Sequence, residues 1–364
     1  MRALAILVMI EAHTLDAWTR AAARYTIAFR SAAILGGFAA PLFLWLAGVS
    51  LVLSAASVAR REGSRGAAVE AVCQRGLEVF VLAFLFRLQA FLLTPGSYPV
   101  TLFRVDILNI MGLSIATAGL VWGLARTTRG GVVVFAAIAA AFAMLTPIVR
   151  AAPLVNALPT WVQWYVRPAG DVTTFTLFPW AGFVFAGAAV GALLASVRSA
   201  KSEYRLQVGL AAAGAALVAA GFYAATRPSM YRSSSFWTSS PTYFVIRVGI
   251  IMVAVAAVYG LALLAERLGL ELRPLQRFGR RSLFVYWIHV ELVYGYATWP
   301  LHGRLPLWGS VCAFAVFATL MYVAVVLSER FVAGWRGRGS AVRSARPATA
   351  RSLFMRELAT LLGR

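Results

Sequence analysis

Runs of apolar residues, each about 17 to 25 residues long, recur along the whole chain and are separated by short polar connections. A helix needs roughly 20 mostly apolar residues to cross the hydrocarbon core of a bilayer. A segment in lipid must also satisfy its own backbone hydrogen bonds, as a helix does. Apolar and polar residues do not alternate with a period of two, which is the pattern of membrane strands. We therefore predict an all-α, polytopic bundle of about ten transmembrane helices. Their expected limits are 1–18, 34–56, 76–93, 106–125, 131–149, 174–196, 206–225, 243–265, 282–298 and 307–330.

This pattern divides the chain into a transmembrane domain at residues 1–332 and a basic cytoplasmic tail at residues 333–364. The tail begins with Gly, Arg, Ser and Ala, which is typical of a linker. Beyond the linker, apolar residues lie on one face of a short predicted helix, with Arg351 and Arg356 opposite, as in helices that lie on an anionic leaflet. The apolar residues are Leu353, Phe354, Leu358, Leu361 and Leu362.

Composition and charge agree with a membrane protein. Hydrophobic residues make up 61% of the 364 residues and charged residues 13%, whereas soluble domains carry about 25% charged residues. The net charge of +21 does not indicate nucleic-acid binding, because the basic residues lie in the connections and the tail, where anionic lipids and the positive-inside rule place them. The connections after even-numbered spans hold more Lys and Arg, so we expect both termini to be cytoplasmic. Cys73 and Cys312 lie far apart and do not indicate a disulfide.

Ionisable groups at membrane depth are costly and are therefore candidate functional residues. His13 is the most informative, because an imidazole can take up and return the proton that acyl transfer moves; alternatively, it is hydrogen-bonded to a neighbouring helix. Asp16 is three residues later on nearly the same helix face, where it either orients the imidazole or is a solvated residue at the helix end. His289 and Glu291 lie in another apolar run, and the same structural alternative applies to His289.

Arg2 precedes His13 by eleven residues, which corresponds to a rise of roughly 16 Å along a helix. One helix would then hold a cation near the cytoplasmic face and a base in the outer half of the membrane. A long cytosolic donor with anionic phosphates and a distant reactive end, such as a coenzyme A thioester, matches this separation. The alternative for Arg2 is a positive-inside anchor.

Three arginines, Arg87, Arg104 and Arg247, also fall in or next to the spans, and Asp106 is their main available partner. A network of these four residues would carry excess positive charge and attract an anion or a carbonyl, with Asn109 adding an amide group. Alternatively, Arg104 and Arg247 reach to the membrane interfaces. No metal-ligand pattern is present in the sequence.

The outer connections, residues 150–173 and 226–242, are rich in Pro, Trp, Tyr, Ser and Thr. Their aromatic residues fit an interfacial belt or, alternatively, a platform on which sugar rings stack. Examples are Trp161, Trp164, Tyr165, Tyr231 and Trp237.

Six stretches of this sequence resemble the bacterial relatives of heparan-α-glucosaminide N-acetyltransferase, within the wider group of membrane acyltransferases. They are Arg2-Ala-Leu-Ala-Ile-Leu through His13, APLFLWLAGVSLVLS (40–54), FRLQAFLL (86–93), VDILNIMGLS (105–114), FPWAGFVFAGAAVG (178–191) and FGRRSLFVYWIHVELVYG (278–295). Each stretch alone is weak evidence for the family, but the six occur in the expected order, and the resemblance runs from residue 1 to about 330. Ala3 follows Arg2 where the wider group usually has glycine.

The resemblance implies a multi-pass enzyme that moves an acetyl or acyl group from cytosolic acyl-CoA to an amine or hydroxyl of a periplasmic or cell-envelope glycan. It also implies that His13 is the catalytic base or a transient acyl carrier. The expected partners are the bilayer, acyl-CoA and the glycan, and a homodimer is compatible with the sequence. A second hypothesis is a transporter or flippase for a lipid-linked sugar or a small solute. The missing internal repeat and the few buried carboxylates favour the enzyme.

Overall fold

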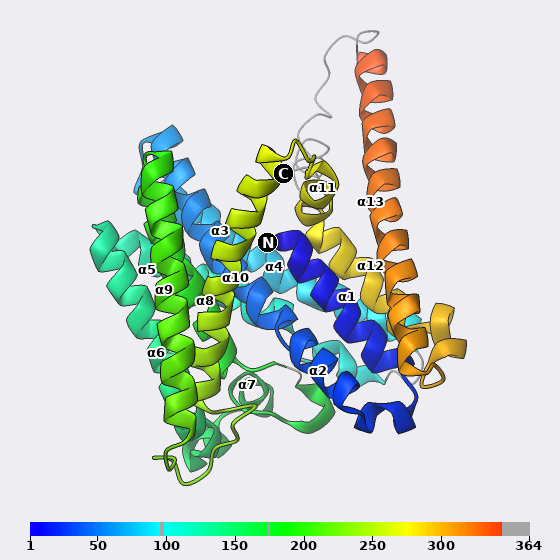
Figure 1. Cartoon of the computed structure of the whole chain (residues 1–364), viewed down its shortest axis with the longest axis horizontal. Coiled ribbons are helices and arrows are strands. Elements are labelled where there is room, and N and C mark those ends of the chain that lie inside the picture. The colour runs from blue at the N-terminus through cyan, green and yellow to red at the C-terminus, as the bar shows by residue number, and fades with distance from the viewer. Residues whose placement is uncertain (95–97, 174, 344–364) are drawn as a thin grey trace. The chain divides into compact units, whose positions relative to one another are not determined.

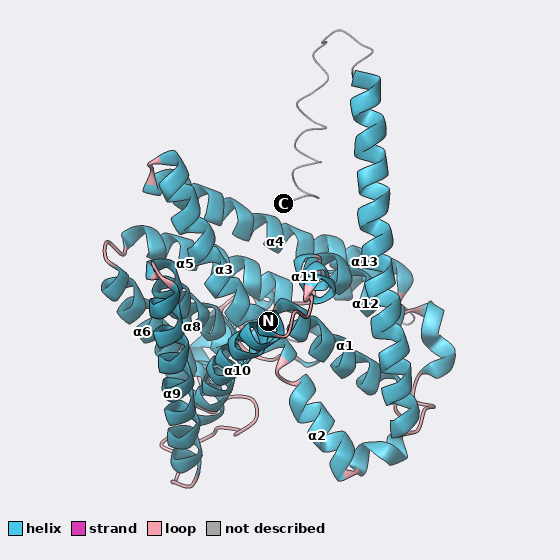
Figure 2. Cartoon of the chain, turned by 45° about the horizontal axis from the view of Figure 1, so that its top comes forward, coloured by secondary structure: helices cyan, strands magenta, loops and turns pink. Residues whose placement is uncertain are grey.

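The computed structural model describes residues 1–94, 98–173 and 175–343, in which the regular elements are α-helices and short 3-10 helices (Figures 1 and 2). The α-helices are α1 (Arg2–Trp18), α2 (Ile27–Gly36), α3 (Ala39–Glu62), α4 (Arg65–Leu93), α5 (Ile107–Leu124), α6 (Thr128–Ala151), α7 (Thr160–Val166), α8 (Leu177–Ser196), α9 (Ala200–Ala225), α10 (Pro241–Arg267), α11 (Arg273–Arg280), α12 (Ser282–Tyr294) and α13 (Leu307–Arg343). The 3-10 helices are η1 (Ala21–Tyr25), η2 (Pro99–Phe103), η3 (Pro153–Ala157), η4 (Gly170–Val172) and η5 (Tyr296–Leu301).

The predicted all-α, polytopic bundle is confirmed. Each of the ten predicted spans coincides with a helix, and within the described residues eight segments are long and apolar enough to cross a membrane. The helices α2 and α3 count together as one of these segments, Ile27–Glu62. The two predicted spans outside the eight are α1, with 17 residues, and α12, with 13 residues. The helices that carry His13 and His289 are therefore shorter than any of these eight segments.

The C-terminal region differs from the expected linker. The helix α13 continues through residue 333, where the linker was expected to begin, and ends at Arg343. The predicted amphipathic helix around Leu353 to Leu362 lies outside the described residues. The chain separates into two compact units, Met1–Ala318 and Thr319–Arg364. The division at residues 332 and 333 stays a prediction, and the site discussed below lies in the first unit.

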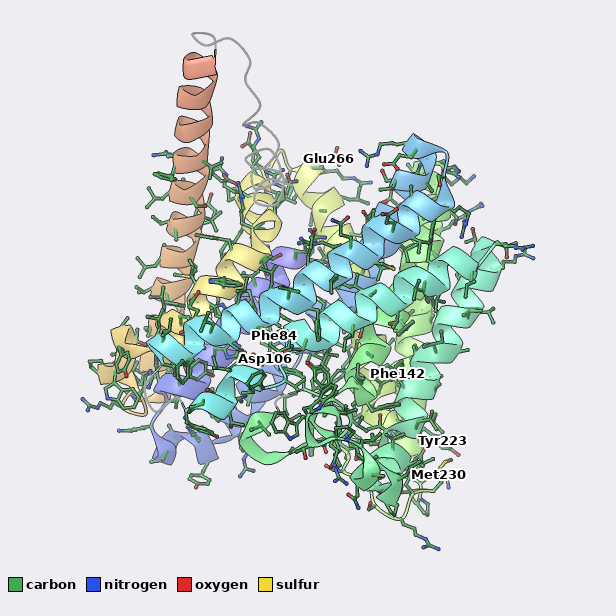
Figure 3. All side chains as sticks on the ribbon, turned by 180° about the vertical axis from the view of Figure 1, so that it is seen from behind. Phe84, Asp106, Phe142, Tyr223, Met230 and Glu266 are labelled. Atoms are coloured by element: carbon green, nitrogen blue, oxygen red, sulfur yellow. The ribbon has the colours of Figure 1, made fainter. Side chains whose placement is uncertain are left out.

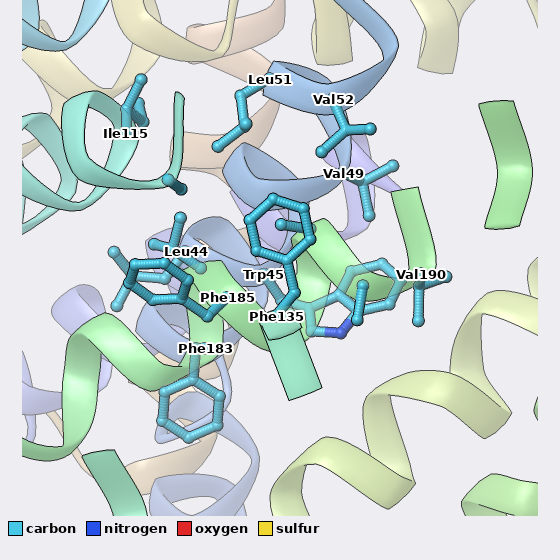
Figure 4. Close-up of a cluster of buried hydrophobic side chains, with 14 of the residues drawn as sticks. Leu44, Trp45, Val49, Leu51, Val52, Ile115, Phe135, Phe183, Phe185 and Val190 are labelled. Carbon is cyan, nitrogen blue, oxygen red and sulfur yellow. The ribbon is translucent and has the colours of Figure 1, made fainter. Parts of the chain in front are cut away.

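The core of the first unit forms where α3 packs closely on α8. A Cβ atom added at Gly48 of α3 would collide with the backbone of Val184, and one added at Gly187 of α8 would collide with the backbone of Trp45. Small residues at such crossings let two membrane helices approach closely. Large apolar side chains surround this contact, as Figure 4 shows for Trp45, Phe135, Phe183 and Phe185.

Local sequence signals explain several helix ends. At the junction of α3 and α4, Gly63 adopts a positive φ of 65°, a conformation that favours glycine. Ser64 follows it and caps α4, because its side chain accepts a hydrogen bond from the backbone N–H of Ala67 (3.2 Å). Thr26 caps α2 in the same way, by accepting a hydrogen bond from the N–H of Phe29 (3.2 Å).

Candidate active site

The C-terminal end of α1 is fixed to the segments that surround α12, which sets the position of His13 (Figure 1). The indole Nε1 of Trp18, a nearly fully buried residue, donates a hydrogen bond to the carbonyl of Val293 (3.3 Å). Backbone hydrogen bonds join Leu305 N to Trp18 O and Arg20 N to Leu305 O, both at 2.9 Å. Thr19 and Ser310 share a buried hydroxyl–hydroxyl bond of 2.8 Å. The C-terminal part of α1, which carries His13 and Asp16, is therefore held firmly.

A tyrosine links His13 to Asp16. The Nδ1 atom of His13 lies 3.0 Å from the hydroxyl oxygen of Tyr294, and that hydroxyl donates to Asp16 Oδ2 at 2.8 Å. The two rings of His13 and Tyr294 meet edge to face, with centroids 5.5 Å apart. The other carboxylate oxygen of Asp16 lies 3.8 Å from Arg24 Nη1. Asp16 is thus well placed to act on His13, but through Tyr294 rather than by direct contact.

His289 lies beside His13, as a second imidazole at the same place. The ring centroids are 5.3 Å apart. His289 is completely buried, and its Nδ1 atom is 2.8 Å from the carbonyl of Val285. Since a carbonyl only accepts, Nδ1 carries a hydrogen, and the lone pair of the neutral ring is on Nε2. That Nε2 atom is buried and has no hydrogen-bond partner within the described part of the chain.

The charge network predicted around Asp106 forms in part. Arg87 of α4 makes a buried ion pair with Asp106, which stands at the start of α5 and is labelled in Figure 3. Asn109 completes a capping box with Asp106 by accepting from its backbone N–H at 2.9 Å. Arg104 lies close enough to interact electrostatically with both Arg87 and Tyr294. This cluster therefore adjoins the tyrosine that contacts His13.

Glu291 joins this cluster from α12, whereas Arg247 does not lie in it. Glu291 accepts a hydrogen bond from Thr94 at the end of α4 (3.3 Å) and interacts electrostatically with Arg87. Arg247 lies instead against the rings of Tyr243 and Trp180, with its guanidinium carbon 4.0 and 5.9 Å from their centroids. The expectation that Asp106 would gather all three arginines was therefore wrong for Arg247, because α10 presents this residue to an aromatic cluster.

Arg2 is placed at the other end of α1. Its guanidinium Nη2 donates to the hydroxyl of Ser50 in α3 at 2.7 Å. A Cβ atom added at Gly279 of α11 would lie 3.2 Å from Arg2 Cβ, so the two segments touch. The short helix α11 is itself basic, with Arg273, Arg277 and Arg280. Since α1 is one continuous helix, Arg2 and His13 are separated by a rise of roughly 16 Å.

The aromatic residues of the outer connections have separate surroundings. Trp237 packs against Tyr243, and the hydroxyl of Tyr231 donates to the carbonyl of Met144 at 2.9 Å. Tyr165 is hydrogen-bonded to Asn109; its burial raises the pKa of the phenol, and this bond opposes the rise. Trp161 is 64% exposed. Among the contacts within the described residues, these aromatic side chains do not form one continuous platform. Tyr165 connects its own segment to the cluster around Asp106.

Sequence reasoning missed Tyr294 and Arg24 as members of the site. Tyr294 lies 281 residues from His13, and its place in an apolar run gives no signal of its own. Arg24 is one of many basic residues in the connections, so the sequence gives no sign that it contacts Asp16. Among the described residues, no group of three or more His, Cys, Asp or Glu side chains is arranged to hold a metal ion.

Comparison with known families gives one finding that bears on this geometry. The model of the family described as "Heparan-alpha-glucosaminide N-acetyltransferase, catalytic" matches residues 1–221. The matched range contains His13, Asp16, Arg2 and the cluster of Arg87, Arg104, Asp106 and Asn109. Arg247, His289, Glu291 and Tyr294 follow it in the chain. A comparison with curated proteins gives no match.

Proposed function

The chain belongs to the family of the heparan-α-glucosaminide N-acetyltransferase catalytic domain, and from this premise we propose that it is a membrane-embedded, acyl-CoA-dependent acetyltransferase. The donor is acetyl-CoA or another acyl-CoA on the cytosolic side. The acceptor is an amine or hydroxyl of a periplasmic or cell-envelope glycan. The observation that carries the proposal is His13, an imidazole within the bundle whose Nδ1 atom contacts Tyr294 and which is held by the fixed end of α1.

In the proposed reaction, His13 removes a proton from the acceptor nitrogen or oxygen as that atom attacks the thioester carbonyl carbon. The new bond forms to carbon, the carbon–sulfur bond breaks, and the coenzyme A thiolate leaves and takes up the proton from the imidazolium. Positioned proton transfer of this kind contributes about 10²- to 10⁴-fold to a rate. The cations of Arg87 and Arg104 and the amide of Asn109 are the proposed electrostatic support for the carbonyl oxygen as it becomes negative.

The donor fits the long axis of α1. Arg2 and the basic helix α11 lie together at the N-terminal end, where they would attract the phosphates of coenzyme A. The thioester would then reach along α1 towards His13. With the N-terminal end of α1 on the cytoplasmic face, as the charge pattern of the connections favours, the acceptor would enter from the opposite side. The bacterial inner membrane with both termini cytoplasmic is the location that we propose.

A transfer assay on the purified protein in nanodiscs tests this function. Labelled acetyl-CoA and a glucosamine-containing acceptor are supplied, and the acetylated sugar and free coenzyme A are measured by mass spectrometry. We expect transfer by the wild type and a loss of about 10²- to 10⁴-fold in kcat for His13→Ala. The matched control is His302→Gln, since His302 lies beside the ring of Trp299 and contacts the carbonyl of Val293 (2.8 Å), to which glutamine can still donate. Equal rates for wild type and His13→Ala would contradict the proposal.

A further inference from the structure

We propose that Tyr294 is a positioning residue that selects one tautomer of His13 and so makes Nε2, and not Nδ1, the base that meets the acceptor. This inference rests on the proposed function and adds to it a residue from the far end of the chain. Asp16 then does not orient His13 directly. The phenol of Tyr294 lies between the carboxylate and the imidazole, so the three residues form a chain.

The carboxylate of Asp16 is the accepting end of this three-member chain. Its side chain is 62% exposed, and Arg24 Nη1 lies 3.8 Å from Oδ1. A guanidinium of Arg24 also donates to the backbone carbonyl of Asp16. The carboxylate of Asp16 therefore faces solvent and a guanidinium, and it accepts the hydroxyl hydrogen of Tyr294. An ionised carboxylate only accepts hydrogen bonds.

The phenol of Tyr294 has a single hydroxyl hydrogen, and this hydrogen points to Asp16. Because Asp16 Oδ2 has no hydrogen to give, the 2.8 Å contact uses the hydrogen of the phenol. The phenol oxygen then offers only a lone pair to His13 Nδ1 at 3.0 Å. Nδ1 must therefore be the donor, and in the neutral imidazole the lone pair lies on Nε2.

Hydrogen bonds at the end of α12 hold this arrangement in place. Tyr294 is the last residue of α12, and the next residue, Gly295, donates its N–H to the carbonyl of Glu291 (2.8 Å). The preceding residue, Val293, accepts the hydrogen bond of Trp18 from α1. The helix that carries the imidazole and the helix that carries the phenol are therefore joined directly beside Tyr294 and five residues after His13. An acid that fixes a histidine tautomer serves the same purpose in hydrolases, and here a phenol transmits the effect.

The variant Tyr294→Phe removes the hydroxyl and keeps the ring. We expect kcat for acyl transfer to fall roughly 10- to 100-fold, the usual cost of losing a partner that orients a functional group, with KM for acyl-CoA unchanged. The matched control is Tyr296→Phe, because Tyr296 is two residues away and 64% exposed. Wild-type kcat in Tyr294→Phe would overturn the tautomer assignment.

A second experiment separates tautomer selection from a purely structural effect. Replacing His13 by Nδ1-methylhistidine blocks Nδ1 with a methyl group and leaves the lone pair on Nε2 whatever residue 294 is. In this background, the Tyr294→Phe change should cost no activity, and the methyl group should raise kcat relative to the Tyr294→Phe variant with ordinary histidine. A persisting loss would show that Tyr294 acts by structure alone and would overturn the proposal.

The two experiments also separate this inference from the proposed function. A wild-type protein without acyl transfer, or a fully active His13→Ala variant, would overturn the function and the tautomer assignment together. An active wild type, an inactive His13→Ala variant and a fully active Tyr294→Phe variant would overturn the tautomer assignment alone.

Discussion

At the scale of single residues, the ion pair of Arg87 and Asp106 contrasts with the other pairs of the bundle. Its side chains are 13% and 7% exposed, whereas those of Arg75 and Glu78, on the same helix as Arg87, are 49% and 29% exposed. Burial raises the cost of leaving either charge alone, because no solvent replaces the lost partner. The two pairs should therefore differ strongly in what they contribute to stability.

Replacing one arginine of each pair by methionine tests this contrast. We expect Arg87→Met to lower the free energy of unfolding by about 3–5 kcal/mol, since it leaves the carboxylate of Asp106 buried without its cation. Arg75→Met should change it by about 0–1 kcal/mol, the range for exposed pairs. Thermal unfolding of both variants in the same detergent measures the difference. Similar losses in the two variants would show that the pair at Asp106 is not a buried one.

Residue identity alone predicted some of these relations and not others. The pairing of Arg87 with Asp106 could be anticipated, because few buried carboxylates are available to a buried arginine. The position of Arg247 against Tyr243 could not, because it depends on which face of α10 meets α8. The link from His13 through Tyr294 to Asp16 also lay beyond prediction, since it joins the two ends of a long chain by one hydroxyl group.

At the scale of elements, the helices could be predicted from apolar run length, and their pairing could not. Apolar runs of about 20 residues predicted the long helices of the described chain, because a segment in lipid must satisfy its own backbone hydrogen bonds. The short helices α2, α7 and α11 were missed, since their length and composition resemble those of connections. One of them, α2, crosses α1 close to the site. A Cβ atom added at Gly36 would lie 2.8 Å from Ala12 Cβ.

This crossing gives a prediction for α1. Gly36→Ala should push α2 away from the turn of α1 that precedes His13, because 2.8 Å is shorter than two carbon atoms tolerate. Such overpacking costs about 1–3 kcal/mol, and we expect both a lower unfolding temperature and a lower kcat. Gly209→Ala is the matched control, since an added Cβ atom there meets nothing within 4 Å. Unchanged stability and activity in Gly36→Ala would mean that α2 does not constrain α1.

At the scale of the whole molecule, the order of the spans determines which connections share a side of the membrane. Five candidate spans separate Ser64 from Ser229, namely Arg65–Leu93, Ile107–Leu124, Thr128–Ala151, Leu177–Ser196 and Ala200–Ala225. An odd number of crossings places the two serines on opposite sides. The excess of basic residues near Ser64 favours the cytoplasmic side for that connection, and we therefore predict that Ser229 lies outside the cytoplasm.

Cysteine labelling in cells tests this topology. In a background that carries Cys73→Ser and Cys312→Ser, a membrane-impermeant maleimide should label Ser229→Cys in spheroplasts. It should label Ser64→Cys only after the membrane is permeabilised. Both connections are exposed to solvent, so a lack of reaction will report sidedness and not burial. Labelling of Ser64→Cys alone in intact spheroplasts would reverse the orientation.

We propose above all that His13 is the base in the transfer of an acyl group from a donor on one side of the membrane to an acceptor on the other. Proteoliposomes that hold labelled acetyl-CoA inside and a glucosamine-containing acceptor outside test it most directly. We predict labelled, acetylated sugar in the external medium and free coenzyme A in the lumen for the wild type, and neither product for His13→Ala. Unmodified sugar accumulating in the lumen, or equal acetylation by the two proteins, would contradict the account.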